Sequence, residues 1–386
     1  MDKKKKNKTS GGQFSATFIY ALIGVWLGFS SGSALEFSSF LEYIKILALL
    51  TISVCVGIVL ATIVHELGHL VFGLLTGYRF QSFRIFKFML KKEKNGKLHF
   101  CSYSLVTTAG QCLMLPPAFD EENFPYVLYN MGGVIFNAVF CILFNLLRIH
   151  TAGSPYTALA FNILMSMNLA MLLTNGIPLK LNGINNDGYN AFAAGKTPES
   201  LYGFWLQLQI CGEYADGTKL SDMPDEWFSC SPEAIAEDSM SAAVAVYAEN
   251  RLMEKHDFEN SEKTAAELAD GDNAVVGIHK AFLGMDRIFC MILRDASAED
   301  VRTVYTKLHS DKTTASLLKA MAVSNPAIAR TEYAYQSVIG KDVKKADNAL
   351  KTFEKLKKTY PNQTEIETEE ELIRLIQAKQ PEEENK

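Results

Sequence analysis

The sequence predicts an α-helical polytopic membrane protein: about four transmembrane helices, a membrane-associated β-hairpin and a soluble all-α C-terminal domain. Four uncharged runs are each long enough to cross a bilayer core, which needs about 20 apolar residues in a helix. The charges are also divided unevenly. The first 190 residues hold 15 Lys and Arg against 9 Asp and Glu, and the remainder holds 23 against 34. After residue 234, Ala, Leu, Glu and Lys dominate with helical spacing, which predicts the soluble part.

The overall composition excludes several classes of protein. The 386 residues are 48% hydrophobic and 21% charged, which argues against a disordered chain, a collagen-like chain and a simple soluble enzyme. A net charge of −5 disfavours nucleic-acid binding. The seven cysteines are scattered and form no C-x-x-C pair, so they indicate neither a disulfide framework nor a structural zinc site.

The apolar runs and the basic clusters together predict a topology. We expect transmembrane helices over about residues 14–35, 44–77, 124–147 and 155–177. The basic tail 1–13 and the basic cluster 79–97 should both be cytoplasmic, since Lys and Arg favour that side. Everything after Lys180 then lies in the cytoplasm as well. The first run also resembles a secretory signal peptide, whose cleavage would leave three helices with the same later topology.

The segment 79–105 mixes aromatic and basic residues and differs from the spanning runs. Asn95-Gly96 is a two-residue hairpin signal between apolar stretches, so we expect a β-hairpin at the inner membrane face. The alternative is a basic amphipathic segment that only touches lipid headgroups.

The C-terminal half predicts a cytoplasmic helical domain over residues 191–362 and an acidic tail over 363–386, either solvated or a frayed helix. Apolar spacing predicts a helical hairpin that turns near Asp257 and a later helix that ends before Pro361. These hairpins resemble tetratricopeptide units without a clean repeat, and the alternative is a plain helical domain. A protein partner could bind this domain.

The strongest chemical signal is His65-Glu66-Leu67-Gly68-His69, an H-E-x-x-H motif in the second apolar run. On a helix, positions i and i+4 share a face, so both imidazoles can reach one zinc ion. Glu66 could then take a proton from zinc-bound water. Ionisable residues in a spanning helix cost at least about 2.5 kcal/mol on insertion scales, so a pair of them suggests a function. The alternative is a hydrogen-bonded structural cluster. The other five histidines have no ligand-like spacing.

A catalytic zinc usually has three protein ligands and a water. No acidic residue occurs between Glu122 and Asp187, and Asp187 falls just beyond the fourth run, on the side where the H-E-x-x-H helix ends. Asp187 is therefore the candidate third ligand.

Over about residues 43–188, the chain resembles the site-2 protease family of intramembrane zinc metalloproteases. Three elements carry the resemblance: the motif His65–His69, Gly133-Val-Ile-Phe-Asn137, and Asn175-x-x-Pro178 followed by Asp187-Gly188. The resemblance implies a three-helix catalytic core with one zinc ion, Glu66 as the catalytic residue, and His65, His69 and Asp187 as ligands. The hairpin is similar to a family element that presents substrate, and the segment 78–123 is too short for the PDZ domain of some relatives.

One departure concerns the third ligand. The family often has Leu-Asp-Gly soon after the proline, where this chain has Leu181-Asn182-Gly183, and its Asp-Gly follows five residues later. We favour Asp187 because a neutral amide is a poor zinc ligand, but Asn182 remains the alternative. Asn137 and Asn175 could bind the substrate or the developing oxyanion, or could serve helix packing.

These expectations describe a zinc metalloendopeptidase that cleaves in or near the transmembrane segments of membrane-anchored proteins or peptide precursors. The simple design suggests a bacterial plasma membrane, with both termini cytoplasmic. One alternative is a membrane zinc peptidase similar to the HtpX-like enzymes, with Glu199 or Glu233 as ligand. Another is an inactive zinc-binding scaffold, which the Asn182/Asp187 spacing favours. A transporter is disfavoured because no inverted repeat is visible.

Overall fold

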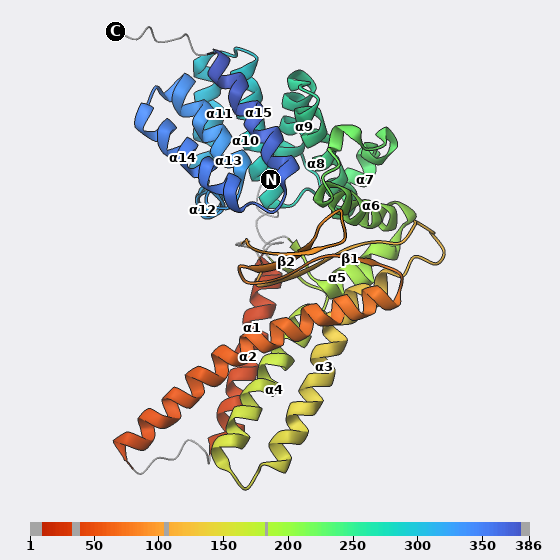
Figure 1. The fold of residues 1–386 in the computed structure, drawn as a ribbon, viewed down its shortest axis with the longest axis vertical. Helices are drawn as coiled ribbons and strands as arrows, with labels where there is room; N and C mark the ends of the chain where they lie inside the picture. The colour runs from red at the N-terminus through yellow and green to blue at the C-terminus, as the bar shows by residue number, and fades with distance from the viewer. Residues whose placement is uncertain (1–9, 33–38, 104–107, 182–183, 380–386) are drawn as a thin grey trace, which may run out of the picture. The chain divides into compact units, whose positions relative to one another are not determined.

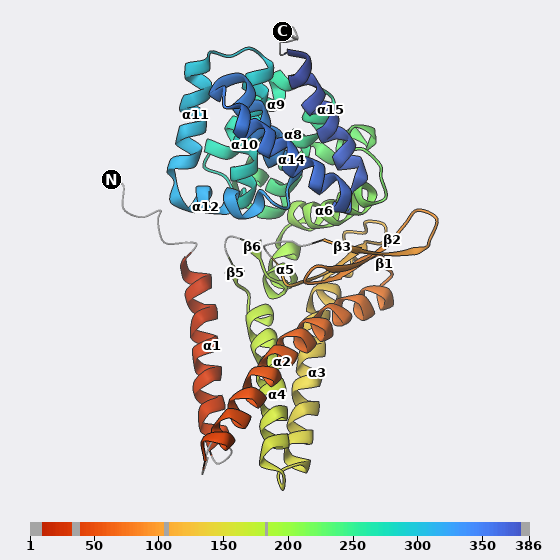
Figure 2. The same ribbon diagram turned by 60° about the vertical axis from the view of Figure 1, so that its left-hand side comes forward.

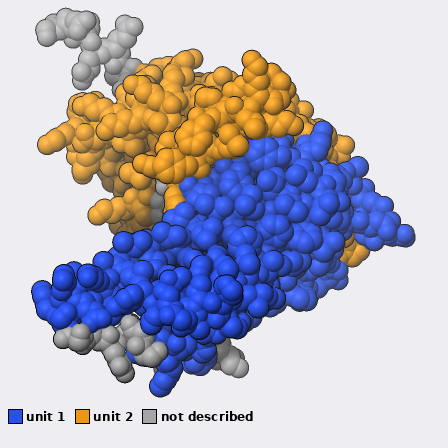
Figure 3. Space-filling model, turned by 60° about the horizontal axis from the view of Figure 1, so that its bottom comes forward, with its two compact units in different colours: residues 1–85, 109–196 blue, residues 86–108, 197–386 orange. Residues whose placement is uncertain are grey.

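The structure, a computed structural model, describes residues 10–32, 39–103, 108–181 and 184–379. The chain forms two compact units, which Figure 3 distinguishes by colour. The first comprises residues 1–85 and 109–196, and the second comprises residues 86–108 and 197–386. The chain therefore passes from the first unit to the second at residue 86, returns to the first at residue 109, and enters the second again at residue 197.

Four helices of the first unit are long and apolar enough to span a membrane, as the sequence predicts. They are α1 (Ser10–Ser30), α2 (Phe40–Leu75), α3 (Tyr126–His150) and α4 (Pro155–Gly176). The second begins four residues earlier than expected because the Ser39 side chain accepts a hydrogen bond from the Glu42 amide and caps it. With 36 residues, α2 is about 54 Å long, well beyond the thickness of a bilayer core.

The helix α2 crosses α3 and α4 obliquely (Figures 1 and 2). Two glycines allow the close approach of α2 and α3: a Cβ at Gly68 would lie 2.2 Å from the carbonyl oxygen of Gly132. Many apolar side chains on the outer faces of α1–α4 are exposed, among them Phe29, Ile52 and Ile142. Such a surface suits contact with lipid.

The region expected to form one hairpin contributes to two antiparallel strand pairs of one four-stranded sheet. In the first unit, β1 (Arg79–Ile85) pairs antiparallel with β4 (Gly110–Leu115). In the second, β2 (Phe88–Lys92) and β3 (Leu98–Ser102) form the hairpin that Asn95-Gly96 predicts, with a φ of 82° at Gly96. The single hairpin over 79–105 is therefore wrong in extent, since a turn at Phe86, with a φ of 52°, separates β1 from β2.

The hairpin also belongs to a different unit from the one predicted for it. It packs against the turn before the last helix, where Lys91 Nζ donates to the carbonyl oxygen of Pro361 over 2.9 Å. The ring of Tyr103 meets that of Tyr360 edge to face, with centroids 5.3 Å apart. Through these contacts, the segment that carries the β2–β3 hairpin belongs to the second unit.

The first unit continues past residue 190, where the predicted domain ends. After α4, the short strands β5 (Lys180–Leu181) and β6 (Ile184–Asn185) pair, and α5 (Asp187–Ala193) follows. The end of this segment packs on α3, because a Cβ at Gly195 would lie 1.9 Å from the hydroxyl of Tyr126. The boundary therefore falls after Lys196.

The rest of the second unit is helical. Its α-helices are α6 (Pro198–Ala215), α7 (Pro232–Glu237), α8 (Ser239–Glu254), α9 (Phe258–Asp270), α10 (Gly277–Leu293), α11 (Ala298–Ser310), α12 (Lys312–Met321), α13 (Pro326–Ala334), α14 (Val343–Thr359) and α15 (Gln363–Lys379). The predicted hairpin at Asp257 is confirmed: α8 and α9 are joined there, and the Asp257 carboxylate caps α9 by accepting from the Asn260 amide.

The expectation of an acidic tail from residue 363 is wrong for its helical part. Three isoleucines and a leucine of α15 are buried in the largest core of the unit: Ile366, Leu372, Ile373 and Ile376. The acidic composition obscures this apolar stripe, which has helical spacing and packs inward. Residues 380–386 lie outside the described part of the chain.

Candidate metal centre

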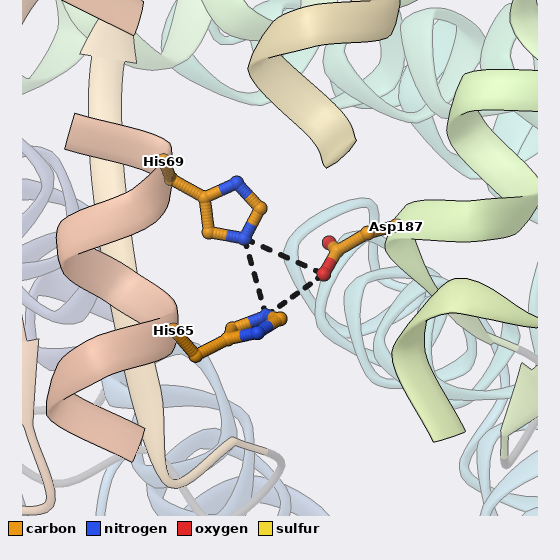
Figure 4. Close-up of side chains that lie close together, drawn as sticks. All are labelled: His65, His69 and Asp187. Carbon is orange, nitrogen blue, oxygen red and sulfur yellow. Dashed lines mark hydrogen bonds and ion pairs between the residues drawn. The ribbon is translucent and has the colours of Figure 1, made fainter. Parts of the chain in front are cut away.

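Three side chains from two distant segments of the chain converge on one point (Figure 4). His65 and His69 project from neighbouring turns of α2, and Asp187 is the first residue of α5. The Oδ2 atom of Asp187 lies 2.8 Å from Nε2 of His65 and 3.4 Å from Nε2 of His69. The two Nε2 atoms are 3.2 Å apart. Residues 122 positions apart thus form one cluster.

The outer nitrogen of each imidazole is held by an acceptor. Nδ1 of His65 lies 2.8 Å from Oδ1 of Asn137, and Nδ1 of His69 lies 2.8 Å from the carbonyl oxygen of Tyr129. A carbonyl oxygen cannot donate, so each Nδ1 carries the proton. In the neutral rings, both Nε2 lone pairs therefore face each other and the carboxylate, an arrangement that calls for a cation.

The donor set fits zinc. Zinc prefers nitrogen and oxygen ligands of this kind, and tetrahedral ligands about 2.0–2.1 Å from the ion lie about 3.3 Å from one another. The three separations in this cluster are 2.8, 3.2 and 3.4 Å. Hydrogen bonds from the remote imidazole nitrogens are the usual support of such ligands. Among the described residues, this is the one His, Cys, Asp or Glu group that converges in this way.

Glycines on α3 let that helix approach the two histidines. A Cβ at Gly133 would lie 2.6 Å from Nδ1 of His65, so any larger residue would push the ring aside. Asn137, one turn further along α3, is fully buried and reaches the same imidazole. The G-x-x-x-N spacing therefore serves both helix packing and the orientation of the His65 ring.

The residue before Asp187 holds it in place. The Asn186 side chain caps α5 by accepting from the Tyr189 amide, and it also accepts from the Leu179 amide. Its Nδ2 donates to the carbonyl oxygens of Thr174 and Ile177, each over 2.7 Å. The three bonds to Leu179, Thr174 and Ile177 tie the start of α5 to the end of α4. The small β5–β6 hairpin between them takes up the residues that separate Asp187 from Pro178.

Electrostatics keeps Asp187 ionised. Burial by itself would raise the pKa of its carboxyl group, but in the metal-free site the charge of a protonated His69 and hydrogen bonds from both protonated imidazoles lower that pKa below the usual value. The group therefore stays a carboxylate, the form that binds a metal.

Glu66 follows His65 on α2 and is buried. Gly110, the first residue of β4, packs directly against it, since a Cβ there would lie 2.4 Å from Oε1 of Glu66. The fully buried Arg84 on β1 donates from Nη2 to the carbonyl oxygen of Gly110 over 3.4 Å. One end of the β1–β4 strand pair thus lies against the carboxyl group of Glu66.

The other predicted site residues have different surroundings. Both polar atoms of the Asn137 amide are engaged, by His65 on one side and by Ala61 and Asn168 on the other, so in this structure Asn137 orients the His65 imidazole. Asn175 donates to the carbonyl oxygen of Met171 on its own helix. Asn182, the alternative ligand, lies outside the described residues.

Several contributing residues had no clear signal in the sequence. The carbonyl oxygen of Tyr129 belongs to the backbone, which sequence patterns do not identify. Gly110 begins β4, whose six residues include no β-branched residue and so gave little indication of a strand. Asn168 and Asn186 are polar residues whose roles depend on partners distant in the sequence. The chain matches no protein-family model, no curated protein and no solved structure.

Proposed function

We propose that the protein is an intramembrane zinc metalloendopeptidase similar to the site-2 proteases. The observation that carries the proposal is the convergence of His65, His69 and Asp187 beside the buried carboxyl group of Glu66, within a bundle of membrane-length apolar helices. The H-E-x-x-H motif alone would provide two ligands. The carboxylate from a separate segment completes the three-ligand set of a hydrolytic zinc site.

Each residue of the candidate site has a distinct role in the proposed peptide hydrolysis. Zinc held by the two imidazoles and Asp187 would polarise the scissile carbonyl group and acidify a water molecule. Glu66 takes one proton from the attacking water and delivers it to the amine nitrogen as the C–N bond breaks. Asn137 and the Tyr129 carbonyl hold the imidazoles in the tautomer that leaves Nε2 free. Burial of Glu66 limits competing contact with bulk water.

The strand β4 offers a means of holding the substrate. It pairs with β1 along one edge, and its first residue lies against Glu66. An extended peptide added along the other edge would carry its carbonyl groups past that carboxylate. A helical substrate would have to unwind locally first, because its carbonyl groups are engaged within the helix. This arrangement moves the proposed substrate contact from the 79–105 hairpin to β4.

The proposed substrates are membrane-anchored proteins or peptide precursors, cleaved in or near their transmembrane segments. The exposed apolar faces of α1–α4 favour an integral membrane location. We place both termini in the cytoplasm on the basic residues of the tail and of 79–97, and we propose a bacterial plasma membrane. The helical unit would then be cytoplasmic and available to a protein partner.

The test combines metal content with cleavage. Wild-type protein in detergent should hold close to one zinc, His65→Ala and Asp187→Ala should lose it, and Glu66→Gln should keep it. A tagged single-span membrane protein co-expressed with each variant should be shortened by wild type alone among these four. His99→Ala, on the exposed hairpin, is the matched control and should behave as wild type.

Each other outcome identifies an alternative. Zinc bound without cleavage of any single-span reporter would favour the scaffold. Retention of zinc by Asp187→Ala would remove the proposed third ligand and direct attention to Asn182, Glu199 and Glu233. Cleavage by Glu66→Gln would contradict its role as proton carrier.

A further inference from the structure

A chain of buried amides connects α4 to the first histidine of the cluster. Asn168 Oδ1 accepts from Nδ2 of Asn137 over 3.0 Å, and Asn137 Oδ1 lies 2.8 Å from Nδ1 of His65. Both asparagines have no solvent-exposed surface. In an apolar bundle, such polar side chains need partners, and here the partners lead from one helix to a metal-ligand candidate on another.

The orientation of each amide is fixed by backbone carbonyls. Asn168 Nδ2 donates to the carbonyl oxygen of Leu164 over 2.9 Å, so its Oδ1 must be the atom that faces Asn137. Asn137 Nδ2 then has two acceptors, Asn168 Oδ1 and the carbonyl oxygen of Ala61 at 3.1 Å. Reversing the Asn137 amide would place its oxygen against both of these oxygens. Its Oδ1 is therefore directed at His65.

We propose that Asn168 is a positioning residue for the metal site: through Asn137 it fixes the tautomer and ring orientation of His65. The inference rests on the proposed zinc site. A reversed Asn137 would present an N–H group to Nδ1 of His65 and move the ring proton to Nε2, where it would block the metal. Ala61 alone would oppose that reversal in the absence of Asn168, so Asn168 strengthens the preference for the productive form.

Zinc affinity in the full-length protein in detergent, measured by competition with a chromophoric chelator, tests this. Asn168→Leu and Asn137→Leu should each weaken zinc binding about 10- to 100-fold, the usual effect of removing a partner of a ligand. Because Asn168 acts through Asn137, the double variant should bind zinc no more weakly than Asn137→Leu. Additive losses would show an independent structural effect and overturn the proposal.

Asn162→Leu is the matched control. Asn162 is also a buried asparagine of α4, but its Nδ2 donates to the hydroxyls of Ser30 and Ser31 at the end of α1. Its loss should leave zinc affinity within about twofold of wild type. An equal loss of affinity in Asn162→Leu would attribute the effect to general damage to α4.

A spectroscopic measurement separates positioning from stability. The visible absorption of the Co²⁺-loaded protein reports ligand geometry, and Asn168→Leu and Asn137→Leu should alter it in the same way. Asn168→Ala serves as a second variant that adds no bulk. If neither Asn168 variant folds while Asn162→Leu does, Asn168 is required for the bundle itself and the proposal fails. If wild type binds no metal, the proposed function fails as well. Unchanged affinity and spectrum in Asn168→Leu overturn the positioning role alone.

Discussion

The α-carbon of Gly188 lies against the backbone of Gly176, so closely that a Cβ at position 188 would be 2.3 Å from the Gly176 carbonyl oxygen. The same Cβ would be 2.9 Å from the carbonyl oxygen of Asn175. The glycine of the Asp-Gly pair is thus required by packing rather than by an unusual backbone angle. It allows the first turn of α5 to seat against the end of α4 and brings Asp187 to the histidines.

Gly188→Ala should therefore weaken metal binding without touching a ligand. Relieving the overlap requires a shift of α5, at a cost of about 1–3 kcal/mol for an overpacked site. We expect a loss of zinc affinity of about tenfold or more, measured by chelator competition. Gly24→Ala on α1, where a Cβ would meet no atom within 4 Å, is the control. Wild-type affinity in Gly188→Ala would show that α5 can move without displacing Asp187.

Gly110→Ala should retain zinc but reduce cleavage, whereas Gly188→Ala should weaken zinc binding itself. The added methyl group would displace the Glu66 carboxylate, which does not bind the metal in the proposed arrangement. A displacement near 1 Å can lower a catalytic rate about 100-fold. Zinc stoichiometry and cleavage of the single-span reporter, measured on the same preparation, check this. Loss of zinc together with cleavage would mean that β4 supports the ligands and not Glu66 alone.

Asn186→Ala should loosen the segment that presents Asp187. The variant loses the cap of α5 and three further hydrogen bonds, and loss of a cap alone usually costs about 0.5–2 kcal/mol. Hydrogen–deuterium exchange of residues 177–193 should accelerate, and zinc affinity should fall. Asn325→Ala removes the cap of α13 in the second unit and should change neither. Unaltered exchange in Asn186→Ala would contradict the role of Asn186 in holding the start of α5.

The docking of α15 should weaken as pH rises toward neutrality. Burial raises the pKa of Glu369 to about 7 despite its ion pair with Arg330, and burial raises that of Glu365 to about 8. A carboxyl group with a raised folded-state pKa keeps its proton longer when folded than when unfolded. Stability is therefore highest below the ordinary pKa of 4.5 and falls between that value and about 7–8, by an amount on the order of a few kcal/mol.

Hydrogen–deuterium exchange of α15 amides in the full-length protein, corrected for intrinsic rates, measures this dependence. Protection should decrease between pH 5 and 8, and Glu369→Gln should flatten the decrease. Glu367→Gln, on the exposed face of the same helix, should leave it unchanged. A protection that does not vary with pH in wild type would contradict a protonated Glu369 in the folded unit.

The pattern of hydrophobicity predicted the helices well and the strands poorly. Four apolar helices and the turn at Asp257 follow from local periodicity, which depends only on neighbours in the chain. The β1–β4 pair does not, because Gly110–Leu115 has no alternating pattern and its partner lies beyond the β2–β3 hairpin. A frayed helix was one expectation for the segment that forms α15, but its packing in the core was missed because many acidic residues conceal its apolar stripe.

The sequence by itself identified three side chains of this candidate site: His65, Glu66 and His69 share a helix, and their spacing is enough to bring two imidazoles to one face. It also narrowed the candidates for a third metal ligand to a few residues. Only the tertiary structure decided that Asp187 meets them, because that contact depends on Gly188 and Asn186 holding α5 against α4. It also assigned Asn137 and Asn168 their partners. Helical periodicity can be recognised from residues that are neighbours in the sequence. The contact between His65 and Asp187 joins residues 122 positions apart, and it forms only when the chain packs.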